Sequence, residues 1–445
     1  MEKAEGIGCV LVKVAIIADD LTGANDTGVQ FSRKGLSTTV LLDLKIQISS
    51  KQDVVAFDTD SRSLSKQEAV ERVDRVCDYI KQQEVLPEII YKKIDSTLRG
   101  NIGGEWDAIY RAFQPDFIVI APSYPKMGRV MKSGSMFVNG SLLHETAASK
   151  DPKNPSTNSY LPELLKEQSE KPFALLTTEL LRGDRARLTE RMKQLYEAGI
   201  PYLLFDAETD EDLANIAGLF RGGDYHVIWS GSAGLAYALT TQVSAMESNK
   251  AQPSTDSDLV MVVVGSVHAA SRRQLDYLLQ QENNIGIELN SLLALTEEGR
   301  NTEYERVSDL ALQALLVQQN VILYSSAGPA TVQSARRQGR EQGMDANQVS
   351  NTISDALGKA AARIIKQCGI SNLVLTGGDT AKQVCLHLGA GEFELITEIE
   401  AGVPVGRLSV HKGINVITKA GGFGGDEVLQ RALETFTGGG RQLNR

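Results

Sequence analysis

The chain has 445 residues, more than one ordinary core needs, because single domains usually run to about 100–200 residues. Its hydrophobic fraction of 42% and charged fraction of 23% are those of a globular protein, and no apolar run reaches the roughly 18 residues of a membrane span. The net charge of −10 argues against a nucleic-acid or anionic-membrane partner, because such proteins carry basic surfaces. We therefore predict two domains in which a few well-placed cations hold any anionic substrate.

The amino-terminal segment and the cysteines indicate a cytoplasmic protein. The first apolar stretch runs into Asp19 and Asp20 without a small-residue cleavage site, so we interpret it as a strand and not as a signal peptide. About 11 residues precede that strand and are expected to be unstructured. The four cysteines are scattered singly, without metal-ligand spacing, as is typical of free thiols in a reducing compartment.

The first half of the chain alternates short β-branched runs with longer amphipathic stretches, a pattern that predicts βα units and a largely parallel sheet. The predicted strands are residues 12–20, 38–43, 53–60, 88–95, 116–122, 173–178, 202–207 and 226–232. The clearest predicted helix begins at Ser65, where Ser65 and Glu68 have the spacing of a capping box. The stretch 122–171 has little periodicity, so we interpret it as a long loop that could serve as a lid.

A polar segment, residues 247–258, predicts an interdomain linker and divides the chain into domains 1–246 and 259–445. A second βα series follows it. Its predicted strands are 259–266, 285–290, 320–326, 372–379 and 415–422, with helices near 269–282, 304–317 and 353–368. The predicted fold class is therefore α/β, with two domains that are each a mostly parallel sheet flanked by helices. We expect the active site in the cleft between them.

Charged residues gather where the predicted strands of the first half end. These residues are Asp19 and Asp20 after the first strand, Asp58, Asp60 and Arg62 after the third, and Lys92, Lys93 and Asp95 after the fourth. Ligands of parallel α/β sheets bind beyond the carboxyl ends of the strands. There, Arg62 or Lys93 can pair with a carboxylate, while aspartates accept hydrogen bonds from hydroxyls and one can take a proton. The mixture predicts a site for a hydroxy acid, although charges at strand ends also occur simply where a chain reaches water.

Two turns of the first half have the composition of binding loops. In ADDLTGANDTG, residues 18–28, we expect Thr22 to cap the following helix and Gly23 to permit close backbone approach to an anion. The run 92–108 carries Lys93, Asp95, Ser96 and Arg99 and is predicted to enter a helix at Asn101 or at the glycine pair that follows it.

The second half has glycine-rich strand ends with few cations, at residues 265–275, 325–330, 375–384 and 419–429. Backbone N–H groups at such turns can hold phosphates without side-chain charge, which predicts a nucleotide site, although glycines there also serve tight packing. His268 lies in one of these turns and could reach a phosphate. The sequence contains no P-loop, GxGxxG, GxSxG or HExxH motif, so the common nucleotide, hydrolase and zinc-protease patterns do not apply.

Seven motifs follow one another along the chain: ADDLTGANDTG, FDTDSR, KKIDSTLRG, APSYPKMGR, VVVGSVH, LTGGDT and KAGGFGG. In this form and order the chain resembles the four-carbon acid sugar kinases from Val14 to about Leu429. The resemblance implies a sugar-acid-binding domain followed by a nucleotide-binding domain. It also implies phosphorylation of the terminal hydroxyl of D-threonate, D-erythronate or a 3-oxo-tetronate with ATP.

The resemblance implies substrate contacts at the Asp19–Asp20 turn, Arg62, Lys93, Ile94, Asp95 and Ser96. It implies ATP contacts at Ser266, Gly377, Gly378, Asp379, Thr380, Gly421 and Gly422. It does not decide which aspartate takes the proton; we favour Asp20 or Asp95. Mg²⁺ is expected to shield the phosphates, and no residue is assigned to it as a ligand.

The form ADDLTGANDTGVQF makes D-threonate the first choice of substrate, with D-erythronate and 3-oxo-tetronate as alternatives. Two other classes of protein are alternatives. A non-catalytic sugar-acid receptor would usually be exported, and a sugar-acid dehydrogenase is disfavoured by the missing dinucleotide motif. The sequence does not decide whether the chain forms a homodimer.

Overall fold

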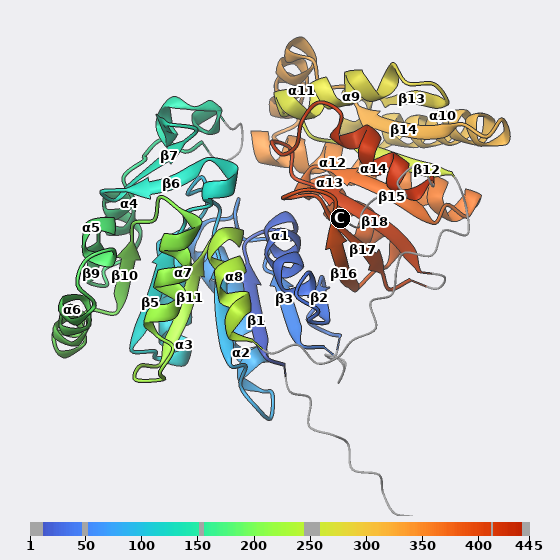
Figure 1. The fold of residues 1–445 in the computed structure, drawn as a ribbon. Coiled ribbons are helices and arrows are strands. Elements are labelled where there is room, and N and C mark those ends of the chain that lie inside the picture. Colours follow the sequence, from blue (N-terminus) through green and yellow to red (C-terminus); the bar gives the residue numbers. More distant parts are fainter. Residues whose placement is uncertain (1–11, 47–51, 151–154, 244–258, 411–412, 438–445) are drawn as a thin grey trace, which may run out of the picture. The chain divides into compact units, whose positions relative to one another are not determined.

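A computed structural model describes residues 12–46, 52–150, 155–243, 259–410 and 413–437. The chain divides into two units, Met1–Asn249 (unit 1) and Lys250–Arg445 (unit 2), which are described separately (Figure 1). The predicted linker and the segment before the first strand lie outside the described residues. The exact domain bounds stay a prediction.

Unit 1 is built on a parallel sheet, because its buried β-branched runs alternate with amphipathic helices. The spatial order of its strands is β2-β3-β1-β4-β11-β5-β10-β9. Their bounds are β1 Val14–Ala18, β2 Thr38–Leu41, β3 Val54–Asp58, β4 Ile89–Lys93, β5 Phe117–Ala121, β9 Phe173–Leu176, β10 Tyr202–Phe205 and β11 Val227–Gly231. All eight predicted strands are confirmed, each within two residues of its predicted ends.

Helices cover both faces of this sheet (Figure 1). On one face α8 contacts both α1 and α7, and on the other face α3 contacts both α2 and α4. The second group closes the main core, in which Trp106 is fully buried. The bounds are α1 Leu21–Ser32, α2 Lys66–Lys81, α3 Ile102–Phe113, α4 Leu161–Gln168, α5 Thr178–Leu181, α6 Arg185–Glu197, α7 Asp210–Leu219 and α8 Ala233–Leu239. The capping box at Ser65 is confirmed.

The stretch 122–171 is not the long loop that the sequence analysis predicted. It forms a small antiparallel sheet of β6 Arg129–Lys132, β7 Ser135–Val138 and β8 Ser141–Leu142, followed by α4. Met131 and Met136 are fully buried in the unit 1 core. Asn139 (φ 50°) and Gly140 (φ 85°) form the turn between β7 and β8, and an Asn-Gly pair is a hairpin signal that the sequence analysis missed.

Unit 2 has a mixed sheet with the spatial order β13-β14-β12-β15-β18-β17-β16. The bounds are β12 Val260–Val264, β13 Asn284–Leu289, β14 Asn320–Ser325, β15 Asn372–Thr376, β16 Glu392–Glu398, β17 Pro404–Leu408 and β18 Ile414–Lys419. The five predicted strands are confirmed and run parallel, whereas β17 pairs antiparallel with both β16 and β18. β16 and β17 were missed, because their alternation is short and interrupted by a bulge at Leu395 to Thr397.

Two helical layers also flank the unit 2 sheet. α9 contacts α14 on the face where Val260, Val262 and Val264 pack, while α12 contacts α10, α11 and α13. The bounds are α9 Ala269–Leu279, α10 Glu297–Leu316, α11 Pro329–Glu341, α12 Ala346–Cys368, α13 Gly378–Leu388 and α14 Val428–Phe436. The helices predicted at 304 and 353 begin seven residues earlier than expected, because Thr296 and Asp345 supply N-caps there.

Within the described ranges, no helix is both long enough and apolar enough to cross a bilayer. Cys77, Cys368 and Cys385 are free thiols in this part of the chain, as predicted.

Candidate active site

Three neighbouring strands of unit 1 bring the predicted substrate residues together. β1 lies between β3 and β4, and its last residue, Ala18, is paired with Asp58 on one side and Lys93 on the other. The residues that follow these strands therefore leave the sheet at the same edge, which is the carboxyl edge where ligands of such sheets bind. The clustering of the first, third and fourth strand ends is confirmed.

Arg62 is held by both aspartates of the first strand end. Its Nε and NH2 groups donate to Asp19 Oδ2 and Oδ1 at 2.7 and 2.8 Å, and its NH1 and NH2 groups donate to Asp20 Oδ2 and Oδ1 at 2.5 and 2.8 Å. A guanidinium has five N–H donors, so these bonds leave one for a further acceptor. Arg62, which was predicted to pair with a substrate carboxylate, thus pairs with two carboxylates of the chain itself.

Asp20 begins α1, and the prediction that Thr22 caps this helix is wrong. The Asp20 side chain accepts a hydrogen bond from the Gly23 N–H at 2.8 Å, and Thr22 lies inside the first turn. A methyl group on Gly23 would lie 2.7 Å from Asp20 Oδ1 and 3.2 Å from Lys93 Nζ, so only glycine lets the helix approach these charges.

The two aspartates differ in proton affinity although they share Arg62. Burial opposes ionisation of Asp19, but Arg62, Lys92 and Lys93 outweigh it and lower its pKa. For Asp20, burial and the charge of Asp19 outweigh Arg62, and the pKa is raised. Asp20 is therefore the better proton acceptor of the pair.

The adjacent lysines at the end of β4 have different surroundings, because successive strand residues point to opposite faces. Lys92 is fully buried and pairs with Glu105 Oε2 at 2.7 Å, while the other oxygen of Glu105 accepts from Ser61. Lys93 is 5% exposed, and its Nζ donates to the Ile94 carbonyl at 2.9 Å. In the part of the chain that the structure describes, no carboxylate lies within ion-pair distance of Lys93 Nζ, so its charge is available to an anion.

The residues after β4 have two kinds of surroundings: some are buried in the unit 1 core, and others lie in the cluster of charged residues around Arg62 and Lys93. The Ile94 side chain is buried in the unit 1 core, so only its backbone faces Lys93. Asp95 Oδ2 accepts from Arg99 Nε at 2.5 Å and from the Thr97 hydroxyl. Burial opposes ionisation of Asp95, yet Arg99 and Arg62 hold its pKa well below the ordinary value. Ser96 is 7% exposed beside it.

Asp26 is a residue of this cluster that the sequence analysis did not single out. It follows Asp20 and Gly23 at three-residue spacing on α1 and is 7% exposed. Its Oδ1 is buried without a hydrogen-bond partner among the described residues. Burial raises its pKa to about 6, with Lys93 acting in the opposite direction. The third aspartate of ADDLTGAND, three residues after Gly23, was the available signal.

In unit 2, three neighbouring strands likewise bring predicted residues together. β12, β15 and β18 are adjacent, and their carboxyl ends carry Ser266, Gly377 and Gly421. A methyl group would lie 3.2 Å from Ser266 N if built on Gly377, and 2.4 Å from Ser266 Oγ if built on Gly421. On Gly422 it would lie 3.4 Å from His268 Nε2. These turns form one surface of closely spaced backbone.

The remaining predicted ATP residues belong to the start of α13. Gly377 is its N-cap with φ 97°, a conformation that favours glycine, and Gly378, Asp379 and Thr380 form the first turn. The Thr380 side chain packs on Gly265, where a methyl group would overlap it. His268 caps α9, since its Nδ1 accepts from the Ala270 N–H at 3.2 Å.

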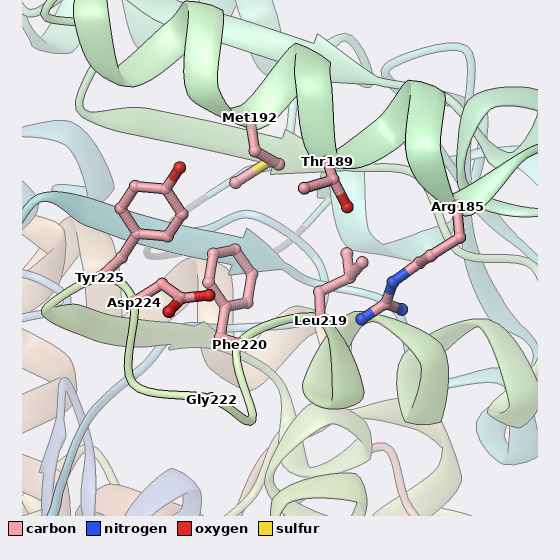
Figure 2. A pocket seen from close by; sticks show the side chains of 8 residues that line it. All are labelled: Arg185, Thr189, Met192, Leu219, Phe220, Gly222, Asp224 and Tyr225. Carbon is pink, nitrogen blue, oxygen red and sulfur yellow. The ribbon is translucent and has the colours of Figure 1, made fainter.

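A surface hollow of unit 1 lies away from these clusters. Figure 2 shows its lining side chains, which come from α6, from the end of α7 and from the loop before β11. Tyr225 precedes the first residue of β11, so the hollow lies toward the amino ends of the parallel strands. None of the predicted site residues lines it.

Within the described residues, no group of three or more His, Cys, Asp or Glu side chains is placed to hold a metal ion. Mg²⁺ commonly binds through substrate phosphates, several waters and one or two carboxylates. Asp379, in the first turn of α13, is a carboxylate of the kind such a site uses.

Comparison with known proteins assigns both halves of the chain. Residues 14–239 match the family model described as a sugar-binding N-terminal domain, and residues 261–429 match the one described as a nucleotide-binding C-terminal domain.

Whole-chain relatives have related activities. The chain is 33% identical to a D-threonate kinase of Salmonella typhimurium, over 95% of this chain and 98% of the relative. It is 29% identical to a D-erythronate kinase of Heliobacterium modesticaldum, over 93% and 94%. It is 26% identical to a 3-oxo-tetronate kinase of Pectobacterium atrosepticum, over 96% and 100%.

Proposed function

The chain belongs to the four-carbon acid sugar kinase family, and from this premise we propose that it converts D-threonate to D-threonate 4-phosphate with ATP. The observation that carries the proposal is that one chain contains two kinds of candidate site: a charged cluster in unit 1 and a glycine-lined surface in unit 2. The identity of 33% to a D-threonate kinase, against 29% and 26% to kinases of the other two acids, supports the choice of substrate.

In this proposal Lys93 binds the substrate carboxylate. Its ammonium is nearly buried and keeps donors for a ligand, whereas Lys92 is occupied by Glu105. A charged hydrogen bond in such a site is stronger than one between neutral groups. Arg62 then neutralises Asp19 and Asp20 and offers its remaining N–H to a substrate oxygen, and the Asp95–Ser96 segment contacts the hydroxyls.

The proton acceptor in this proposal lies on α1. A general base works best when its pKa is near the working pH, and the pKa of Asp95 is far below that range. The raised pKa of Asp20 makes it our first choice. Asp26, six residues further along on α1 and with one oxygen that has no hydrogen-bond partner among the described residues, is the alternative.

ATP is assigned to unit 2, at Ser266, the Gly377–Thr380 turn and the Gly421–Gly422 turn. Mg²⁺ would neutralise phosphate charge, with Asp379 as the expected protein ligand. Transfer needs the acceptor hydroxyl in line with the β–γ bond, so an active site between the two domains remains part of the proposal. A cytoplasmic location and a homodimer stay predictions.

A turnover assay tests the function. The chain is incubated with ATP and Mg²⁺ and with D-threonate, D-erythronate or 3-oxo-tetronate, while ADP release is followed and the phosphorylated carbon is located by NMR. We expect the highest kcat/KM with D-threonate. A higher value with either other acid would reassign the substrate, and no ADP release with any of them would favour the receptor class. Activity only with a nicotinamide cofactor would favour the dehydrogenase class.

A further inference from the structure

The turn after β18, residues 420–426, has its carbonyl groups held by three buried side chains. Lys419 Nζ donates to the carbonyls of Ala420 and Phe423 at 2.8 and 3.2 Å and lies 3.4 Å from that of Gly421. Lys419 is 2% exposed. The lysine therefore binds the turn that follows it and does not extend into solvent.

Two residues of α9 bind the same turn from the side. Gln274 Nε2 lies 3.0 Å from the carbonyls of Phe423 and Gly424 and 3.2 Å from that of Gly425. Ser271 Oγ donates to the Gly421 carbonyl at 2.8 Å. Ser271 and Gln274 are three residues apart on the helix and fully buried, so they face the turn together.

These contacts fix the direction of the N–H groups as well. The C=O and N–H of a trans peptide unit point in opposite directions, and no cis peptide bond occurs in the described chain. The carbonyls of 420, 421, 423, 424 and 425 point toward Lys419 and α9. The N–H groups of the residues that follow them must point away: Gly421, Gly422, Gly424, Gly425 and Asp426.

None of those five N–H groups donates to an acceptor among the described residues. A run of N–H groups turned to one side forms a concave site for anions, and turning the carbonyls inward removes the oxygens that would repel a phosphate. The surface lies against Ser266 and His268, because a methyl group on Gly421 or Gly422 would meet those side chains. It is therefore continuous with the predicted ATP residues of β12 and β15.

We infer that Lys419, Gln274 and Ser271 are positioning residues that aim the N–H groups of the 420–426 turn at the phosphates of the nucleotide. The inference rests on the proposed use of ATP by unit 2. It extends the predicted contact from Gly421 and Gly422 to Gly424, Gly425 and Asp426. It also predicts that the three side chains affect the binding of phosphates and not the binding of the nucleoside. The reason is that they contact only the turn proposed to face the phosphates.

Calorimetric titration of the full chain with ADP and, separately, with adenosine tests the inference. Gln274→Met removes the donors at nearly constant volume, and Ser271→Ala removes one hydroxyl. We expect Gln274→Met to weaken ADP binding about tenfold and Ser271→Ala about threefold, as the loss of such hydrogen bonds implies, with adenosine affinity unchanged. Gln281→Met is the matched control: its side chain donates to the Tyr277 carbonyl at the other end of α9, and ADP affinity should stay at the wild-type value.

If the variants bind ADP and adenosine with equally reduced affinity, the inference is overturned, since that pattern indicates general damage to unit 2. So would wild-type ADP affinity in both variants. If Gln274→Met fails to fold by circular dichroism, Ser271→Ala alone decides the matter. A wild-type chain that binds neither ADP nor ATP would instead refute the proposed function, which keeps the two failures distinct.

Discussion

The candidate sites of the two units are built from different groups. Unit 1 gathers side-chain charges: Arg62 and Lys93 lie beside Asp19 and Asp20 at adjacent strand ends, and Asp26 follows on α1. Unit 2 uses backbone at the corresponding strand ends, where glycines bring main chain close to main chain and Lys419 binds carbonyls. Side-chain charges can recognise a small acid by the position of each group. Backbone N–H groups suit a phosphate, which offers many equivalent oxygens.

The adjacent lysines of β4 give the strongest test within unit 1. Lys93→Met should lower kcat/KM for the tetronate about 1,000-fold with little change in stability, because truncating one partner of a buried charged hydrogen bond costs several kcal/mol of binding. Lys92→Met should instead destabilise unit 1 by about 3–5 kcal/mol, since Glu105 keeps a buried charge without its cation.

Steady-state kinetics and urea unfolding measure the two effects. Both tryptophans, Trp106 and Trp229, lie in unit 1, so intrinsic fluorescence reports the unfolding of that unit. The double variant Lys92→Met/Glu105→Leu should recover most of the lost stability, because an apolar pair can replace a buried ion pair. Loss of turnover in Lys92→Met with unchanged stability would reverse the roles assigned to the two lysines.

The sequence indicated Lys92 and Lys93 as candidates, but it could not tell which of the two is paired with a buried carboxylate. The strand ends and the glycine turns follow from short-range patterns, so the α/β class and the residues proposed for the candidate site could be chosen from the sequence. The partner of Lys92 is Glu105, thirteen residues away on α3, and the partners of Arg62 are more than forty residues away. Pairings of that kind depend on tertiary packing, and no local pattern reveals them.

The unit 2 site was less predictable for the same reason. Glycine at 421, 422, 424 and 425 indicates close backbone approach. The side chains that donate to the carbonyls of this turn, Ser271 and Gln274, lie about 150 residues earlier in helix α9, however, and no sequence pattern marks them. The cap of α1 was misassigned because Asp20 and Thr22 both suit an N-cap, and only the backbone decides between them.

The second prediction concerns the proton acceptor. Asp20→Asn should lower kcat about 100-fold and leave KM for ATP unchanged, because general-base catalysis contributes at least about that factor. It should also remove the acidic limb of the pH–rate profile. If Asp20→Asn keeps that limb and Asp26→Asn loses it, the base is Asp26. A normal profile in both variants would exclude α1 as the source of the base.

The third prediction tests the backbone site of unit 2. Gly421→Ala places a methyl group 2.4 Å from Ser266 Oγ and should raise KM for ATP about tenfold, as overpacking of this kind costs one or two kcal/mol. KM for the tetronate should not change. Gly218→Ala, where nothing lies within 4 Å of the added carbon, is the matched control. An equal rise in both KM values for Gly421→Ala would contradict a nucleotide-specific role for the turn.

The last prediction concerns the effect of the buried Asp26 carboxylate on the free energy of unfolding of unit 1. The pKa of Asp26 is raised from 3.8 to about 6 in the folded chain, so folding is favoured by the protonated form and that contribution is lost as the pH rises through 6. A shift of about two units corresponds to about 3 kcal/mol. Asp26→Asn should therefore stabilise unit 1 by up to about 3 kcal/mol at pH 8 and hardly at all near pH 4.

Urea unfolding followed by tryptophan fluorescence at both pH values measures this difference, with Asp224→Asn, an exposed loop position of unit 1, as the control. Stabilisation that is equal at both pH values would mean that charge is not the cause. The expected pattern would indicate that the ionised Asp26 carboxylate destabilises the folded form of unit 1, as residues at sites adapted to chemistry often do.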